Sequence, residues 1–168
     1  ESTRAIHNYF FVKGLDCIKE GGLLAFITSQ GVLDSPRNEA IRRYLMQNSR
    51  LISALRLPSG MFSDNAGTDV GSDLIVLQKQ TGKEISEGIE QQFVETVSVP
   101  KEEGSSVVFK HNSLFVGDWK DISHRTIATE RIMGTDSYGR PAWEYRFTGG
   151  IEEMAESLRT QLSLEMGQ

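Results

Sequence analysis

The residues of this chain best suited to binding chemistry are arginines in its first third. Between Asp34 and Arg56 the sequence holds five arginines against two acids, whereas the whole chain of 168 residues has a formal net charge of -5. Three of them, Arg37, Arg42 and Arg43, fall on or near the outer face of one expected helix. The window is either a phosphate-facing surface or a solvated helix face, and the sequence leaves both interpretations open.

Other kinds of site have little support in the sequence. Cys17 and the three histidines do not recur at the spacing of metal ligands, so no metal site is expected. A single cysteine excludes an internal disulfide and favours a reducing compartment, and Cys17 is best interpreted as a packed core residue rather than a reactive thiol. The second half holds no nucleophile with its base, carboxylate pair or nucleotide fingerprint. No apolar run approaches the length of a membrane span.

The element that organises the rest of the chain is the run LLAFITS at residues 23–29. It carries no charge and follows two glycines, a pattern typical of a parallel strand buried on both faces. Residues 6–20 carry apolar side chains at helical spacing, and Gly21 and Gly22 end that helix. The sequence therefore predicts a helix that leads into a core strand.

A second helix and two more strands are expected after this strand. The helix is capped by Asp34 or Ser35 and runs to about residue 48. Residues 51–57 then form a strand parallel to the first, which completes a βαβ unit. No helix fits before the third strand at residues 73–79, so that strand is expected to run antiparallel to the second. The polar loop between them is long enough to be functional, but it lacks the GK[ST] dipeptide of a P-loop.

The second half of the chain is predicted to be a connecting region. Strands at residues 93–99 and 104–110 are expected to form a hairpin. Residues 136–141 make a turn by composition, and residues 151–166 form a closing amphipathic helix.

Four segments in this order resemble a known family. They are YFF with KEGGLLAFITS at residues 9–29, LRLPSGMF at 55–62, GTDV at 67–70 and DLIVLQK at 73–79. The pattern resembles the second half of the S-adenosylmethionine-dependent adenine-N6 DNA methyltransferases found in the modification subunits of type I restriction systems. The shorter matches NSLF and DSYGRP, after residue 111, resemble the region that follows the methylase core in large bacterial and phage proteins that join an adenine methylase to a helicase.

The resemblance implies a fold and a set of partners. Residues 1–80 would form part of a Rossmann-like methyltransferase sheet, its last three strands, with the final strand antiparallel between the other two; residues 81–168 would form a small α+β extension. The full-length enzyme would use S-adenosylmethionine and double-stranded DNA in the bacterial cytoplasm. The upstream half of the methylase domain, and in some relatives a fused helicase, would be its partners.

Two motifs of that family are absent from this sequence. One is the glycine-rich turn that holds the cofactor, and the other is the catalytic Asn or Asp followed by Pro-Pro and an aromatic residue. Both are expected to precede residue 1, so the chain alone is expected to be inactive and to bind no cofactor. The family's catalytic motif holds an adenine that has been flipped out of the duplex, so that its amine can attack the methyl group of the cofactor.

Four residues take a role from the resemblance. Phe62 stands where related enzymes offer an aromatic ring that stacks on the flipped base, although it would equally serve to anchor its loop to the core. Thr28, Ser29 and Gln30 lie at the carboxyl end of the first strand, where such folds place their ligands, and are candidates for lining the same pocket.

The resemblance also leaves the first strand without a neighbour along one edge. Open apolar edges pair with other chains, so the isolated fragment is expected to self-associate, either by strand pairing or by exchange of the helix at residues 151–166.

Two other functions remain open from the sequence. One is a non-catalytic DNA-binding or docking module of a larger helicase or methylase protein, in which the arginines of residues 37–56 touch phosphate. The other is a different α/β enzyme whose site lies outside this chain. A glycine-rich turn and an Asn-Pro-Pro motif just upstream in the parent gene would separate the first hypothesis from these two.

Overall fold

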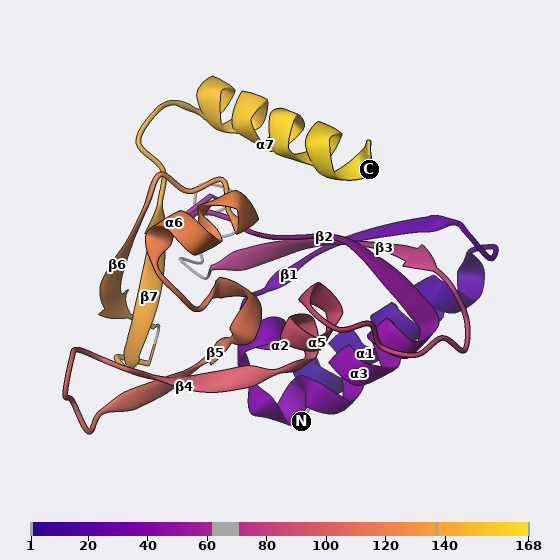
Figure 1. Cartoon of the computed structure of the whole chain (residues 1–168), viewed down its shortest axis with the longest axis horizontal. Helices are drawn as coiled ribbons and strands as arrows, with labels where there is room; N and C mark the ends of the chain where they lie inside the picture. The colour runs from indigo at the N-terminus through magenta and orange to yellow at the C-terminus, as the bar shows by residue number, and fades with distance from the viewer. Residues whose placement is uncertain (1, 62–70, 137, 168) are drawn as a thin grey trace.

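The computed structural model of the chain describes residues 2–61, 71–136 and 138–167. Its centre is a three-stranded sheet. Helices lie on both faces of this sheet (Figure 1). The spatial order of the strands is β1 (Leu23–Ser29), β3 (Ser72–Lys79) and β2 (Ser49–Arg56). Helices α1 (Ser2–Cys17) and α3 (Glu39–Asn48) lie on one face, and α7 (Ile151–Met166) lies on the other. The mixed α/β fold class is confirmed.

The predicted strand order is also confirmed. β3 runs antiparallel to both of its neighbours and lies between them, so β1 and β2 run in the same direction. The turn into β1 needs a left-handed residue, and Gly21 supplies it with a φ of 78°. Lys79, the last residue of β3, fixes that turn because its carbonyl accepts a hydrogen bond from the amide of Gly21 at 2.9 Å.

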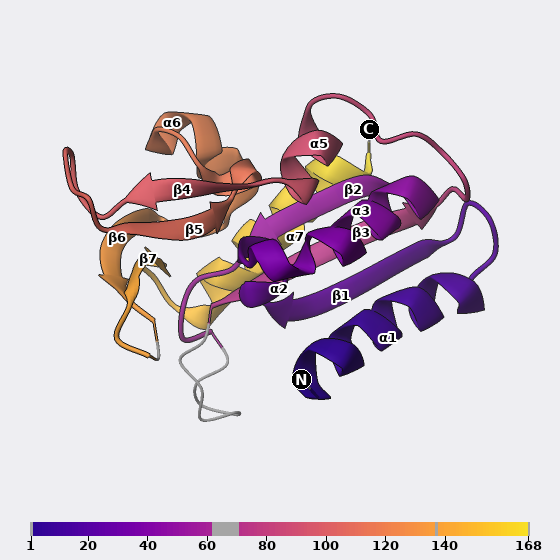
Figure 2. The same cartoon turned by 90° about the horizontal axis from the view of Figure 1, so that it is seen from below.

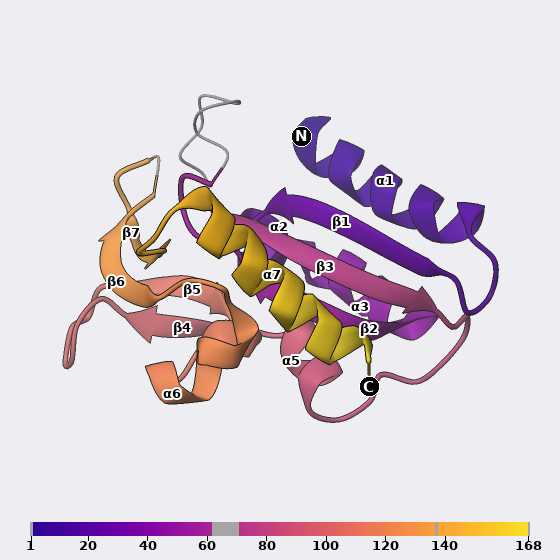
Figure 3. The ribbon, with the colours of Figure 1, turned by 90° about the horizontal axis from the view of Figure 1, so that it is seen from above.

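The prediction that β1 is buried on both faces is wrong. Leu23 is 49% exposed and Ile27 is 59% exposed. The reason is visible in Figure 3, where α7 lies across β3 and β2 and leaves β1 beside it. Among the described residues β1 has one strand neighbour, β3, and is therefore the edge of the sheet.

The helix before β1 begins and ends earlier than its apolar spacing predicts. Phe11 and Leu15 are buried against the sheet, but Phe10 is 58% exposed. Cys17, the last residue of α1, is exposed, so its interpretation as a packed core residue is wrong. The cause is that α1 packs along the sheet edge with one narrow stripe, which leaves the rest of its surface uncovered (Figure 2).

The helix expected from Asp34 or Ser35 to residue 48 is divided into three pieces. These are α2 (Gly31–Asp34), a short 3₁₀ turn (Pro36–Asn38) and α3. Ser35 separates them in an extended conformation because the residue before a proline avoids the helical region. Its hydroxyl oxygen accepts a hydrogen bond from the amide of Arg37 at 3.3 Å, which confirms it as a cap.

The second half contains two hairpins. β4 (Thr96–Pro100) pairs with β5 (Val108–Asn112), which confirms the first expected hairpin, although the short helix α5 (Ile89–Val94) takes the place of its predicted start. β6 (Glu130–Thr135) and β7 (Pro141–Arg146) form a second, unpredicted hairpin, whose connection contains the turn expected at residues 136–141. The short helix α6 (Trp119–Ile122) lies between the hairpins in sequence, and α7 has the predicted bounds.

One apolar core joins the two halves of the chain. Phe93, Phe115 and Tyr145 are buried in the same cluster as Phe11 and Leu15. A smaller cluster on the opposite face of the sheet includes the partly buried side of α7. The division into residues 1–80 and 81–168 stays a prediction. No helix in the described part of the chain is long and apolar enough to cross a membrane.

Candidate functional site

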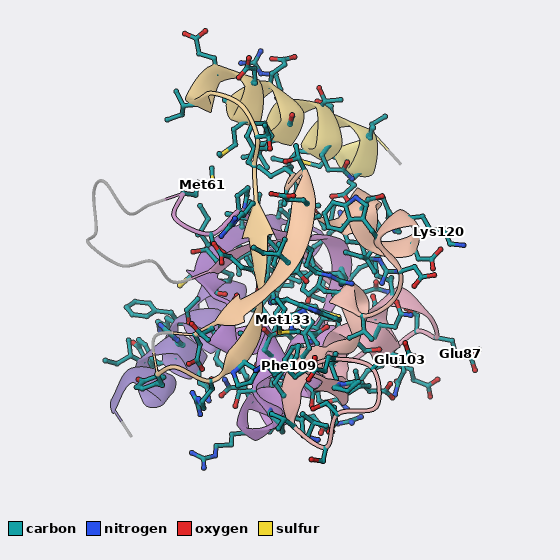
Figure 4. All side chains as sticks on the ribbon, turned by 90° about the vertical axis from the view of Figure 1, so that its left-hand side faces the viewer. Met61, Glu87, Glu103, Phe109, Lys120 and Met133 are labelled. Atoms are coloured by element: carbon teal, nitrogen blue, oxygen red, sulfur yellow. The ribbon has the colours of Figure 1, made fainter. Side chains whose placement is uncertain are left out.

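A hollow lies where β1 and β2 end. Because these strands point the same way, the residues that follow them emerge at the same end of the sheet. The β6–β7 hairpin lies opposite this end of the sheet. Figure 4 views the molecule from the side of the hairpin, and its labels Met133 and Phe109 mark β6 and β5. The hollow measures about 770 Å³ and takes from the sheet side Ser29, Gln30, Gly31, Ser59 and Gly71.

Small residues keep this hollow open. A Cβ atom at position 71 would lie 2.2 Å from Oε1 of Gln30, so the side-chain amide of Gln30 packs directly against Gly71. The backbone of these two residues is joined as well, since the Gln30 amide donates to the Gly71 carbonyl at 2.9 Å. On the hairpin, Gly134 pairs with Ala142, and no bulky side chain projects from either position.

A second hollow of about 490 Å³ continues from the first. Gln30, Asp136, Ala142 and Trp143 line both, and the second extends to the carboxylate of Asp34. The two hollows make one groove that runs under the end of the β6–β7 hairpin. Its described lining combines the amide of Gln30, serine hydroxyls and aromatic rings with charged side chains of both signs, among them Asp136 and Arg140. Such a mixture of rings and polar groups suits a flat polar ligand.

Behind the groove lies a buried polar centre at Arg56, the last residue of β2. Its guanidinium donates two hydrogen bonds to Asp73, both at 2.8 Å, and two to Asp34, at 2.8 and 3.1 Å. The ring of Phe115 lies over it, 4.4 Å from the guanidinium carbon to the ring centroid. Asp34, Asp73 and the ring come from three different parts of the chain, so Arg56 joins them.

Burial and neighbouring charges determine the protonation states of Arg56, Asp34 and Asp73. Burial disfavours the charge on Arg56, but the carboxylates of Asp34 and Asp73 outweigh that effect and raise its pKa. Burial raises the pKa of Asp73. Burial opposes the charge on Asp34 as well, but the nearby charge of Arg56 outweighs it and lowers the pKa of that carboxyl. The guanidinium and the Asp34 carboxylate are therefore charged together.

His111 on β5 completes the centre as a neutral ring. Burial and the nearby charge of Arg56 lower its pKa to about 3. Its Nε2 lies 3.3 Å from Nη1 of Arg56, which can only donate, and 2.9 Å from the hydroxyl of Tyr145. Nε2 must therefore accept, and the proton sits on Nδ1, which faces Asp34 at 3.5 Å. A histidine held neutral in this way joins β5 and β7 to the sheet.

The arginines of the basic window do not form one surface. Arg37 and Arg43 are exposed, and Arg43 pairs with Glu39 at 2.8 Å. Arg42 is fully buried, which corrects its predicted place on the outer face. Its guanidinium donates to the carbonyls of Val32, Ser35 and Val94 at 2.7 to 2.9 Å, because α5 packs over that side of α3. Arg56 likewise has no access to phosphate.

The predicted pocket residues are partly brought together. Ser29 and Gln30 line the groove side by side. Thr28 points the other way, as strand alternation requires, and lines a separate hollow between α1 and β1 with Phe10 and Phe26. Phe62 lies outside the described residues.

The sequence missed the hairpin wall of the groove. Asp136, Trp143 and Arg146 line it, and no apolar alternation in β6 or β7 revealed these strands. The one available signal was the turn-forming stretch at residues 136–141, which marks the connection between them. Within the described chain, no group of three or more His, Cys, Asp and Glu side chains is arranged to hold a metal ion.

Comparison with known proteins gives three results. A protein-family model described as N-6 DNA methylase matches residues 3–130. Defense against restriction protein B of Escherichia phage P1 is 31% identical over 72 residues, which are 43% of this chain and 3% of that protein. The crystal structure of the M protein of the type I restriction enzyme EcoKI matches 96% of this chain and 44% of its own chain, with a TM-score of 0.44 and 14% identity. The matches thus span less than half the length of either relative.

Proposed function

We propose that this chain, which belongs to the N-6 DNA methylase family, is part of an enzyme that transfers a methyl group from S-adenosylmethionine to the N6 amine of adenine in DNA. The family match over residues 3–130 carries this proposal. It agrees with the resemblance found in the four sequence segments. The three-stranded sheet would be the last part of a Rossmann-like methyltransferase sheet, with β3 as its antiparallel strand.

The groove at the ends of β1 and β2 is the proposed place of the target adenine. Ser29 and Gln30 offer hydroxyl and amide groups for the edge of a flipped base. Phe62, in the loop after β2, would stack on the face of that base. The catalytic motif and the cofactor turn are absent from this sequence, so the chemistry would need a polypeptide segment that carries them.

Loss of the Phe62 ring tests this assignment in the protein that carries the chain together with its catalytic motif. One base-stacking contact is worth about 1 to 3 kcal/mol, so Phe62→Ala should lower adenine methylation by roughly 5-fold to 150-fold. Phe62→Leu should recover part of the rate because it restores apolar area. An unchanged rate in Phe62→Ala, with an unchanged unfolding temperature, would leave the ring only a structural role.

The 168-residue chain by itself is proposed to be inactive and to leave S-adenosylmethionine unbound. Calorimetric titration of the chain with S-adenosylmethionine tests this directly. Saturable binding in the micromolar range would contradict the proposal that the cofactor site lies outside these residues.

The exposed edge of β1 is proposed to pair with another polypeptide, either the upstream half of the methylase domain or, in the isolated chain, a second copy. Unpaired strand edges with apolar side chains such as Leu23 and Ile27 are templates for such pairing. Light scattering of the isolated chain should give more than the monomer mass of 18.8 kDa. A clean monomer would contradict self-association.

The alternative of a non-catalytic DNA-binding module is not favoured. It depends on the arginine window, and burial removes both Arg42 and Arg56 from it. Arg37 and Arg43 remain proposed phosphate contacts of the methyltransferase. Replacing either with alanine should reduce the salt dependence of DNA binding by about one counterion.

A further inference from the structure

We propose that the tip of the β6–β7 hairpin, through Tyr138 and Arg140, contacts DNA beside the target base. This inference rests on the proposed function, because it places a DNA duplex at the groove. It assigns a role to a region that lies beyond the residues matched by the family model.

Both side chains project from the molecule. Tyr138 is 81% exposed, and the side chain of Arg140 is 69% exposed. The guanidinium carbon of Arg140 lies 5.0 Å from the centroid of the Tyr138 ring, so the two form one exposed unit. An exposed aromatic ring beside an arginine offers both a face for stacking on a base and a charge for phosphate.

The carboxylate of Asp136 joins the described residues of the tip. One oxygen of the Asp136 carboxylate accepts the amides of Tyr138 and Arg140, both at 2.9 Å. The other oxygen accepts Nε of Arg140 at 2.9 Å, and Gly139 provides the left-handed residue of the turn. Side chains on a fixed turn lose less freedom when they bind than side chains on a loose loop.

The tip stands at the proposed base pocket. Tyr138 lines the hollow that contains Ser29 and Gln30, and Arg140 lines the adjoining hollow. Asp136 lies between them and lines both. A base held against Ser29 and Gln30 would therefore keep its neighbouring nucleotides within reach of the hairpin.

The charge of Arg140 remains available to a phosphate. Asp136 occupies only its Nε, and no other hydrogen-bond partner of this guanidinium is found in the described parts of the chain. Exposed ion pairs are weak, so a phosphate can compete with or add to this one. The described chain neighbours of the ring, Thr135, Asp136 and Gly139, are polar or small, and Arg140 adds a positive charge that suits a partner offering phosphate as well as bases. DNA is therefore the favoured partner.

The chain offers a matched control for Arg140. Arg159 on α7 is 75% exposed and pairs with Glu156 on its own helix at 3.1 Å. α7 covers the face of β2 and β3, away from the lining of both hollows. The two arginines share charge, exposure and a local acidic partner, and they differ in their position relative to the groove.

The test uses the protein that carries this chain together with its catalytic motif. The probe is a fluorescently labelled duplex of mixed sequence, with anisotropy as the readout at several salt concentrations. Tyr138→Ala should raise the Kd for DNA by about 5-fold to 150-fold. Arg140→Ala should weaken binding and reduce the salt slope by about one, while Arg159→Ala should match the wild type.

Each outcome separates this inference from the proposed function. If Tyr138→Ala and Arg140→Ala methylate DNA like the wild type and keep its Kd for DNA, the inference is overturned and the proposed function stands. The same holds if these variants keep that Kd but lose a protein partner. Equal weakening by Arg140→Ala and Arg159→Ala would overturn it as a general charge effect. A wild-type protein that binds DNA through Tyr138 and Arg140 without methylating adenine would support the inference and overturn the proposed function.

Discussion

The molecule contains two groups built from the same residue types, and they differ in burial. At the centre, Arg56 binds Asp34 and Asp73 with Tyr145 close by, and all but the edge of Asp34 is closed to solvent. At the hairpin tip, the exposed Arg140 binds the partly exposed Asp136 beside the exposed ring of Tyr138. A buried charge is strongly destabilising when its partner is lost, whereas an exposed pair contributes little. The first group therefore holds the fold, and the second is free to bind.

The largest effect is expected at the buried centre. Arg56→Leu leaves the carboxylates of Asp34 and Asp73 without their partner in a closed site. Removing one member of a buried ion pair costs about 3 to 5 kcal/mol, so the free energy of unfolding measured in urea should fall by that amount. A loss below about 1 kcal/mol would mean that Arg56 does not hold the two halves together.

The matched control is Arg43→Ala. Arg43 also pairs with a carboxylate at 2.8 Å, but both side chains are half exposed. We expect a change in the free energy of unfolding of at most about 0.5 kcal/mol. Similar losses in Arg56→Leu and Arg43→Ala would contradict the role that burial has in the comparison.

A smaller effect concerns pH and His111. Its pKa is about 3 in the folded chain against about 6.5 when unfolded, so the unfolded state binds the proton first as pH falls. The contribution of the neutral His111 ring to the free energy of unfolding is fully present above pH 6.5. It falls between pH 6.5 and pH 3 by up to about 1.4 kcal/mol per pH unit. Unfolding in urea between pH 6 and pH 4.5 should show this slope.

Two histidine variants isolate the source of that slope. His111→Gln removes the titrating ring and should flatten the dependence in this range. His124→Gln changes an exposed histidine and should keep it. A slope that persists in His111→Gln would assign the acid sensitivity to other groups.

The smallest effect on stability is expected at the exposed group. Arg140→Ala removes a pair whose arginine is exposed, so the free energy of unfolding should change by at most about 0.5 kcal/mol, as for Arg43→Ala. Circular dichroism during thermal unfolding checks this. A large loss would mean that the hairpin tip supports the fold and would weaken its comparison with Arg56.

Local patterns predicted most of the sheet. The uncharged run at residues 23–29 between glycines and polar residues marks β1, and the lack of room for a helix before residue 73 gave the antiparallel direction of β3. The end of β1 likewise placed Ser29 and Gln30 at a hollow. These features depend on residues that are close together in the sequence, so local patterns are enough to predict them.

Burial that depends on distant residues was not predictable. Arg42 is covered because the carbonyl of Val94, 52 residues away, accepts its Nε, and no periodicity on α3 reveals that contact. The exposure of Leu23 and Ile27 reflects where α7 lies on the sheet. The hairpin wall was missed because β6 and β7 mix charged, small and aromatic residues without alternation.

This chain is proposed to be part of an enzyme that methylates adenine at N6. The most direct measurement is mass spectrometry of nucleosides from DNA incubated with S-adenosylmethionine and the protein that carries this chain with its catalytic motif. We predict N6-methyladenine as the product and its loss when the cofactor is omitted. Methylcytosine in its place, or DNA that stays unmodified, would contradict the account.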